Sequence, residues 1–213
     1  MYIPVWFREE DPRILHELMR LYSFATLITT PEGLPFASHL PFLLDTERGP
    51  SGTLRAHMAK ANPQWQHFAG CEEALVIFQG PHAYISPSWY ADQLSVPTWN
   101  YVVVHAYGAP HLLEETTTRA LLQDLVETFE APLEPSWRMD SLPEDYIAKM
   151  LRGLVGFEIE ITRLEGKLKL SQNRPAADHE QVIEVLQKSG DPDASGVADW
   201  MKSREEGTGK REE

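Results

Sequence analysis

The chain has 213 residues, of which 42% are hydrophobic, so it can bury a sizeable core and is not globally disordered. Its formal net charge of −13 disfavours nonspecific nucleic-acid binding, because an acidic surface repels the phosphate backbone. The single cysteine, Cys71, excludes an intrachain disulfide and any cysteine-based metal motif. No apolar run approaches the roughly 18 residues of a membrane-spanning helix, and no signal-peptide pattern opens the chain, so we expect a cytoplasmic protein without membrane contact.

The first half of the chain predicts one helix followed by short strands. Asp11 is a good N-cap and Pro12 suits the first helical position, so a helix is expected from Pro12 to Tyr22. A second cap-and-proline pair, Asn62 and Pro63, predicts a short helix to Phe68. The expected strands cover residues 24–29, 36–44, 53–58, 74–79, 82–86 and 99–107, with 111–113 as a continuation.

Helices enter later in the chain. Apolar residues at helical spacing predict an amphipathic helix over 115–130. Ser141 and Glu144 fit a capping box for a helix that ends near Arg152. Strict alternation then predicts a half-exposed strand over 155–161.

The C-terminal part combines a helix with a polar tail. Asp178 is a candidate cap for a helix that ends near Lys188. From Ser203 onward the chain is polar and charged, which is typical of a disordered segment. We therefore expect one domain over residues 1–190, with helical insertions at about 115–152, followed by a short helix and an acidic tail over 191–213.

Consecutive short strands with late helices favour a mainly β protein, an antiparallel barrel with added helices, over alternating βα units. Several motifs narrow this expectation, because in their order and composition they resemble the PaiB family of FMN-binding negative transcriptional regulators. The resemblance runs from residue 1 to about residue 190. The motifs are the start of the chain through Phe7 and residues 37–42, 57–65, 83–90, 96–101 and 169–174.

The resemblance implies an antiparallel split β-barrel of the FMN-binding type, related to pyridoxamine-phosphate oxidase. In that superfamily two subunits pair and the flavin lies in the cleft between them, so the resemblance implies a homodimer and FMN as cofactor. It also implies that phosphate is held on the strand-to-helix stretch after the third strand, and that a C-terminal segment helps to close the site.

The stretch from His57 to Gln64 contains the groups that a phosphate dianion needs. Lys60 supplies a positive charge, and Asn62 caps a helix whose free N–H groups could face an anion. Taken alone, the same residues also fit an ordinary helix entry with a solvated lysine. On the neighbouring strand Ser38, His39 and Leu40 could pass along the flavin ring; His39 also fits a surface histidine.

Aromatic and cationic residues form the remaining candidates. Trp99 could stack on the flavin, although barrel and interface packing is the favoured interpretation of any single ring. Gln79 could bond to the ring edge or merely satisfy the backbone. His105 and Tyr107 are weaker candidates. The cationic stretch after residue 168 could reach a phosphate or substrate from the partner subunit; alternatively it is a solvated loop. The candidate cofactor-binding residues are therefore Ser38, His39, Leu40, His57, Lys60, Asn62, Gln79, Trp99, Lys169, Gln172 and Arg174.

Three functions are consistent with the sequence and its resemblance. The first is an FMN-binding negative transcriptional regulator, the second a flavin-dependent oxidoreductase acting on a small molecule, and the third a flavin carrier or sensor that works through a protein partner. The acidic charge and the lack of a basic helix make direct DNA binding doubtful, so an indirect route is favoured. The histidines show no metal-ligand spacing, and no catalytic residue can be assigned from the sequence.

Overall fold

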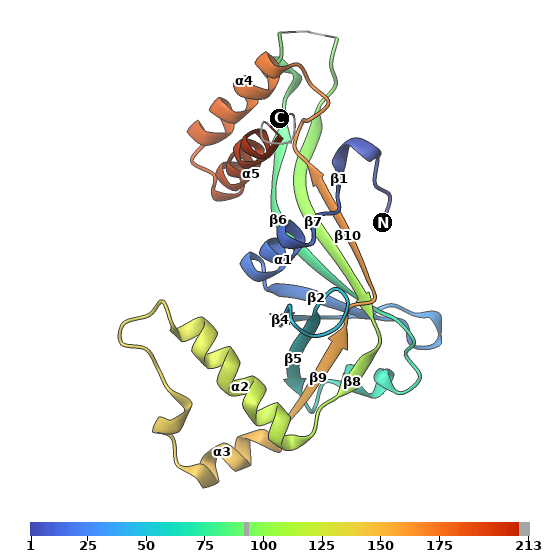
Figure 1. The fold of residues 1–213 in the computed structure, drawn as a ribbon, viewed down its shortest axis with the longest axis vertical. Helices are drawn as coiled ribbons and strands as arrows, with labels where there is room; N and C mark the ends of the chain where they lie inside the picture. The colour runs from blue at the N-terminus through green and yellow to red at the C-terminus, as the bar shows by residue number, and fades with distance from the viewer. Residues whose placement is uncertain (92–93, 209–213) are drawn as a thin grey trace. The chain divides into compact units, whose positions relative to one another are not determined.

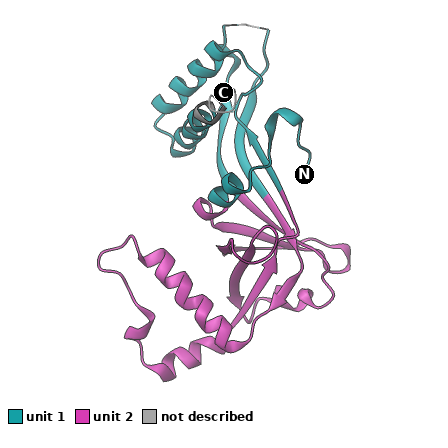
Figure 2. Cartoon of the chain, viewed as in Figure 1, with its two compact units in different colours: residues 1–18, 79–104, 165–213 teal, residues 19–78, 105–164 magenta. Residues whose placement is uncertain are grey.

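The computed structural model describes residues 1–91 and 94–208 of the chain. It divides into two compact units, each built from separate stretches of sequence (Figure 2). Unit 1 contains residues 1–18, 79–104 and 165–213, and unit 2 contains residues 19–78 and 105–164.

Unit 2 contains most of the short antiparallel strands. Strand β2 pairs with β3 and with β6, while the other four strands form a sheet in the order β4-β5-β9-β8 (Figure 1). Phe42, Phe78 and Phe157 are buried in its core, with the ring centroid of Phe42 6.0 Å from each of the other two. The strands that lie wholly in this unit are β2 (Phe24–Thr29), β3 (Phe36–Pro41), β4 (Leu43–Asp45), β5 (Thr53–Ala59), β8 (Pro110–Leu112) and β9 (Leu154–Glu160).

Two helices and a connecting loop are added to this sheet. Helix α2 (Glu115–Glu130) buries Leu121 and Leu125, and helix α3 (Glu144–Leu151) buries Ile147. The buried Thr118 of α2 lies against Gly156 of β9, where a Cβ atom would meet Thr118 Oγ1 at 2.4 Å. The short 3₁₀ helices of the unit are η2 (Pro31–Gly33), η3 (Pro63–Phe68) and η5 (Met139–Ser141).

Unit 1 packs helices α4 and α5 together beside its strands, which follow the order β1-β10-β7-β6 (Figure 1). Leu168 and Leu170 are buried, as are Val182 of α4 and Met201 of α5. The three longer strands, and also α1, have residues in both units. The elements are β1 (Arg8–Glu9), α1 (Pro12–Leu21), β6 (Ala74–Ile85), β7 (Thr98–Gly108), β10 (Arg163–Lys169), α4 (Ala176–Lys188) and α5 (Pro192–Thr208), with 3₁₀ helices η1 (Val5–Phe7) and η4 (Pro87–Trp89).

The architecture confirms the predicted class, a mainly antiparallel β protein with added helices. The helix predicted over 115–130 is observed with these bounds, and the Asp11 cap is confirmed by a hydrogen bond of 2.9 Å from Arg13 N–H to Asp11 Oδ1. The predicted break at Gly80-Pro81 is wrong: β6 runs through it, and both residues are buried within the strand.

Three predictions at helix ends are also corrected. Ser141 does not cap α3, because its hydroxyl donates to the carbonyl of Arg138 and α3 begins after Pro143 without a side-chain cap. Asp178 does not cap α4 either: it is buried in the first turn, where Oδ1 accepts a hydrogen bond from Ala91 N–H. Helix α5 continues to Thr208, past the expected start of disorder at Ser203; residues 209–213 lie outside the described part.

Candidate functional site

The candidate residues of unit 2 meet where strand β3 lies beside the entry of η3. Asn62 Nδ2 donates to Ser38 Oγ at 2.8 Å, and Asn62 Oδ1 accepts from Gln64 N–H at 3.0 Å. The predicted cap is therefore confirmed, and two residues chosen from separate motifs are in contact. The same bonds occupy Asn62 within the chain, so its capping role is structural.

Gln64 is a buried residue of this region that sequence reasoning missed. Its side chain is fully buried, and Nε2 donates to the carbonyls of Leu27 and Phe36 and to Thr29 Oγ1, at 3.1–3.2 Å. Its Oε1 atom is buried without a hydrogen-bond partner among the described residues. Gln64 thus links η3 to strands β2 and β3 by hydrogen bonds. In the sequence, only its position between Pro63 and Trp65 pointed to this role.

His39 and Lys60 are exposed beside this junction, whereas Leu40 is half-buried. His39 Nδ1 lies 2.9 Å from Thr26 Oγ1 on the paired strand. The backbone of Lys60 is fixed, because its N–H donates to Gly153 at 2.8 Å and its carbonyl accepts from Trp65 Nε1 at 3.0 Å. The Lys60 side chain is therefore exposed to solvent, whereas its backbone is held by two hydrogen bonds.

His57 lies on β5, opposite Gly156 of β9. Its Nδ1 atom is buried and has no hydrogen-bond partner among the described residues. Burial lowers the pKa of His57 from its ordinary value of 6.5, since the charged imidazolium is poorly solvated there. His57 is consequently neutral at pH 7.

The weaker candidates of unit 2 form a separate cluster. His105 Nδ1 lies 3.4 Å from the Tyr107 hydroxyl, and the Arg163 guanidinium lies 3.4 Å from the centroid of the Tyr107 ring. Arg163 also bonds Glu73 at 2.8 Å. This positive charge is thus already balanced by a carboxylate.

The candidate residues of unit 1 gather around the end of β10. Lys169 Nζ donates to Thr98 Oγ1 at 2.6 Å and to the Trp99 carbonyl at 2.5 Å. Lys167, two residues earlier on the same face, is only 8% exposed; its Nζ donates to the Tyr2 carbonyl at 3.2 Å and lies 5.2 Å from the Tyr101 ring centroid. Two lysines are therefore held among aromatic rings and neutral oxygens.

Neighbouring positive charges surround these lysines. Burial lowers the pKa of Lys169, and the positive charges of Lys167 and Arg174 lower it further. Among the described side chains, no Asp or Glu forms an ion pair with any of the three. By contrast, eight arginines elsewhere in the described structure pair with carboxylates.

Exposed aromatic residues lie beside this cation cluster, Lys167, Lys169 and Arg174. Trp99 is 52% exposed, and its ring centroid lies 5.9 Å from that of Tyr84 and 6.0 Å from that of His82. Gln79, also exposed, belongs to β6, the strand that carries Tyr84. Aromatic faces and cations thus occur together in unit 1.

Gln172 and Arg174 follow β10 and have different roles. Gln172 closes a local turn, with Oε1 accepting from Leu170 N–H at 2.7 Å and Nε2 donating to the Leu168 carbonyl at 2.5 Å. Arg174 donates to Ser95 Oγ at 3.1 Å and covers the Tyr90 ring at 4.5 Å. Both line a pocket of about 410 Å³ in unit 1, a volume that suits a small molecule.

Other classes of site find no support in the described residues. Residues 1–91 and 94–208 contain no group of three or more His, Cys, Asp or Glu side chains placed to hold a metal ion. Within the same ranges, no helix has both the length and the apolar character needed to cross a membrane.

Comparison with solved structures supports the fold. The chain is similar to the FAD and heme binding protein from Mycobacterium smegmatis, with a TM-score of 0.61 and 16% identity over 81% of this chain and 78% of that one. It is also similar to the flavocytochrome Anf3 from Azotobacter vinelandii, with a TM-score of 0.62 and 15% identity over 82% of this chain and 75% of that one. The likeness confirms the predicted split-barrel fold class, and at this identity it shows the fold alone.

Sequence comparison shows the family. The chain is 38% identical over 204 residues to the protease synthase and sporulation protein PAI 2 of Bacillus subtilis, covering 96% of this chain and 98% of that protein. Residues 1–163 match the family model described as "Putative FMN-binding domain". The chain belongs to this FMN-binding domain family, together with PAI 2.

Proposed function

We propose that this protein binds FMN and uses the cation cluster Lys167, Lys169 and Arg174 to hold the phosphate. The observation that carries the proposal is the presence of three neighbouring cations that form no ion pair with a described carboxylate, in an otherwise acidic protein. A phosphate dianion would offset the repulsion among the three cations. Its oxygens would accept hydrogen bonds from the N–H groups of Lys169 and Arg174.

The surroundings of the cluster also suit the rest of the cofactor. A flavin ring needs apolar faces with polar edges, and Trp99 and Tyr84 expose such faces. When bound, FMN would supply redox chemistry, whereas the residues of this chain would bind and orient it. Lys169 is the residue most directly affected by the cluster, because the charges of both Arg174 and the buried Lys167 act on it.

Lys60 is a second candidate for the phosphate. It is exposed at the entry of η3, where sequence reasoning placed the phosphate site. Because η3 has six residues and a 3₁₀ geometry, its N–H groups add little, and any contribution rests on the lysine charge. Lys169 and Lys60 are therefore alternative phosphate ligands, and substitutions can distinguish them.

A comparison of FMN with riboflavin tests the assignment, since riboflavin lacks the phosphate. Flavin fluorescence would be titrated with wild-type protein, Lys169→Met, Lys60→Met and the control Lys188→Met, whose lysine is exposed on α4 and pairs with Glu184. We expect Lys169→Met to weaken FMN by about 1.5–3 kcal/mol, the scale of a charged hydrogen bond, and to leave riboflavin unchanged. Equal losses for both flavins would remove Lys169 from the phosphate site. A selective loss in Lys60→Met alone would move the site to η3.

We further propose that the protein acts as a cytoplasmic, homodimeric regulator related to PAI 2, through protein contacts instead of direct DNA binding. The net charge of −13 and the pairing of eight arginines with carboxylates leave few cations to contact a duplex. The exposed rings of Trp99 and Tyr84 support pairing of two subunits, since exposed aromatic residues are typical of interfaces.

A further inference from the structure

The α2–α3 hairpin, residues 114–152, exposes apolar side chains that the core of unit 2 does not use. The inner faces of its helices are packed, through Leu121 and Leu125 of α2 and Ile147 of α3. The outer surface nevertheless carries large apolar side chains that are each between 43% and 51% exposed. They are Phe129, Leu133, Trp137, Tyr146 and Met150. Exposed apolar residues concentrated in one short segment are characteristic of an interaction surface.

The hairpin is held in place before any partner arrives. Arg119 of α2 forms two hydrogen bonds to the Glu144 carboxylate of α3, at 2.5 and 2.9 Å. Arg55 of β5 bonds Asp124 of α2 at 2.8 Å. The exposed side chains are thus presented on a fixed support, which lowers the ordering cost of binding.

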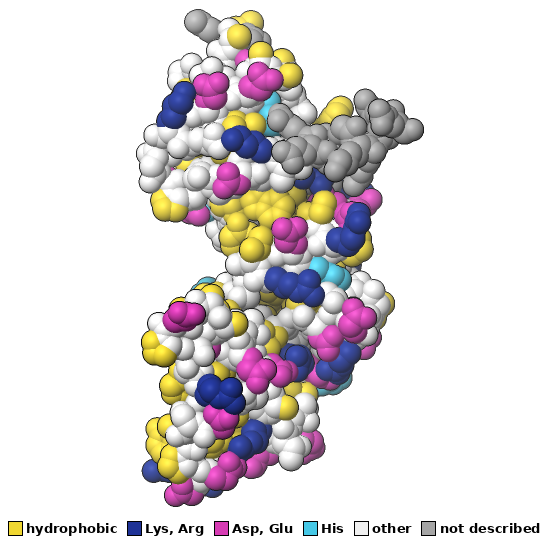
Figure 3. All heavy atoms as spheres, turned by 60° about the vertical axis from the view of Figure 1, so that its left-hand side comes forward, with side chains coloured by type: hydrophobic (Ala, Val, Ile, Leu, Met, Phe, Trp, Pro, Cys, Tyr) yellow, Lys and Arg dark blue, Asp and Glu magenta, His cyan; other side chains and the backbone are white. Residues whose placement is uncertain are grey.

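The hairpin is also strongly acidic. Between residues 114 and 152 the sequence has nine Asp and Glu residues against four Lys and Arg residues. Two of those four, Arg119 and Arg138, are bonded to the carboxylates of Glu144 and Asp140 in the same segment. In Figure 3 the lower part of the view, which includes this hairpin, shows hydrophobic side chains beside acidic and basic ones. Such a surface repels nucleic acids and anionic membranes and attracts basic partners.

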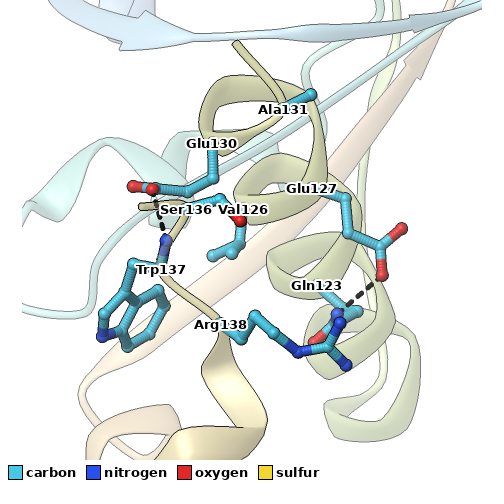
Figure 4. A pocket seen from close by; sticks show the side chains of 8 residues that line it. All are labelled: Gln123, Val126, Glu127, Glu130, Ala131, Ser136, Trp137 and Arg138. Atoms are coloured by element: carbon cyan, nitrogen blue, oxygen red, sulfur yellow. Dashed lines mark hydrogen bonds between the residues drawn. The ribbon is translucent and has the colours of Figure 1, made fainter. Parts of the chain in front are cut away.

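A pocket beside the α2–α3 loop adds to the preference of this surface for a basic partner. It has a volume of about 160 Å³, too small for a cofactor but suited to the end of one side chain, and it lies at the C-terminal end of α2 (Figure 4). Glu130 Oε2 accepts from the backbone N–H of Trp137 at 2.7 Å, and Glu127 Oε1 accepts from Gln123 Nε2 at 2.7 Å. Arg138 also lines the pocket, where it interacts electrostatically with Glu127 and pairs with Asp140, and the Trp137 indole adds an aromatic face for a cation.

From this geometry we infer that the α2–α3 hairpin docks a partner protein through a basic, amphipathic segment. A lysine or arginine of that segment would meet the carboxylate of Glu127 or that of Glu130, which point to opposite sides in Figure 4, while its apolar side chains would cover Trp137 and Leu133. The C-terminal end of α2 favours the same cation, because its carbonyl groups carry partial negative charge. This surface shares no residue with the cation cluster, so the docking proposal does not rest on the proposed flavin site.

A model peptide tests the inference directly. The probe is a fluorescein-labelled peptide with two copies of the heptad Lys-Leu-Ala-Lys-Leu-Ala-Lys, and the comparison peptide has glutamate in place of every lysine. Fluorescence anisotropy with the full-length protein at about 0.15 M salt should show binding of the lysine peptide only. Binding of both peptides with similar affinity would overturn the proposal.

Matched variants locate the site. Glu127→Gln combined with Glu130→Gln, and separately Trp137→Ser, should each weaken the lysine peptide about tenfold. The control pair Glu180→Gln with Glu184→Gln on α4 and the control Leu34→Ser change exposed residues outside the hairpin and should have no effect. All these residues are at the surface, and circular dichroism would verify folding. Unchanged binding in the hairpin variants, or equal weakening in the controls, would overturn the proposal.

Light scattering tests whether the surface is instead covered by a second copy of this chain. We expect Trp137→Ser to have the same molar mass as the wild type. If the substitution instead converts a dimer into single chains, the surface is covered by a second subunit and the docking proposal is wrong.

Discussion

Gly156→Ala is expected to separate helix α2 from strand β9 and thereby destabilise the support of the hairpin. An added Cβ would lie 2.4 Å from Oγ1, 2.9 Å from Cγ2 and 3.0 Å from Cβ of Thr118. Rotation of the threonine about its Cα–Cβ bond can move Oγ1 and Cγ2 but not the Cβ, which would still lie 3.0 Å away, so the helix or the strand must shift. Overpacking of this kind costs about 1–3 kcal/mol, and a chain of this size loses about 2–4 °C of melting temperature per kcal/mol.

The measurement is denaturant unfolding of four proteins: wild type, Gly156→Ala, Thr118→Ala and the double variant. Thr118→Ala removes the two closest atoms, so the double variant should recover roughly half or more of the loss. Gly153→Ala is the matched control, because its Cβ would approach only the Met150 carbonyl, at 3.3 Å. A Gly156→Ala protein with the wild-type midpoint, or losses that simply add in the double variant, would refute the packing argument.

Two further predictions concern protons and DNA. The buried His57 has a lowered pKa in the folded state, so the unfolded chain binds its proton first and stability should fall as the pH drops below 6.5, by at most about 1.4 kcal/mol per pH unit. Unfolding measured from pH 7 downward should show a shallower fall in His57→Asn; an identical pH profile would remove His57 as a cause. Random duplex DNA should show no mobility shift at about 0.15 M salt with micromolar protein. A salt-sensitive shift that Lys167→Gln and Lys169→Gln abolish would show direct DNA contact.

Local signals in the sequence were sufficient for many elements. The Asn62 cap and the helix over 115–130 depend on residues a few positions apart, and both are observed. Strand β10 was not predicted, because Gly166 interrupts its apolar face and Lys167 is a charged residue in a buried position. The structure explains the glycine: a Cβ there would lie 2.2 Å from Leu15 Cδ2 and 2.9 Å from the Glu9 carbonyl oxygen. That crowding depends on residues more than 150 positions away.

The candidate site shows the same division between local and distant information. Motif resemblance selected Ser38 and Asn62, but their hydrogen bond joins residues 24 positions apart. The contact of Lys169 with Thr98 spans 71 positions, and burial of Lys167 beside Tyr2 spans 165. Composition showed that these lysines were unusual in an acidic chain. Only the fold shows that they share one strand face and lack carboxylate partners among the described side chains.

The discontinuous make-up of unit 1 has a consequence for how the protein is made. Strand β1 pairs Arg8 with Lys167 and Glu9 with Gly166, so β1 finds its partner only after synthesis has passed residue 167. Until then Leu15 of α1, which lies against Gly166, lacks that neighbour. Such long sequence separations slow folding, and transiently exposed surface promotes aggregation. Production at low temperature or with chaperones that shield nascent chains should therefore raise the yield of folded protein.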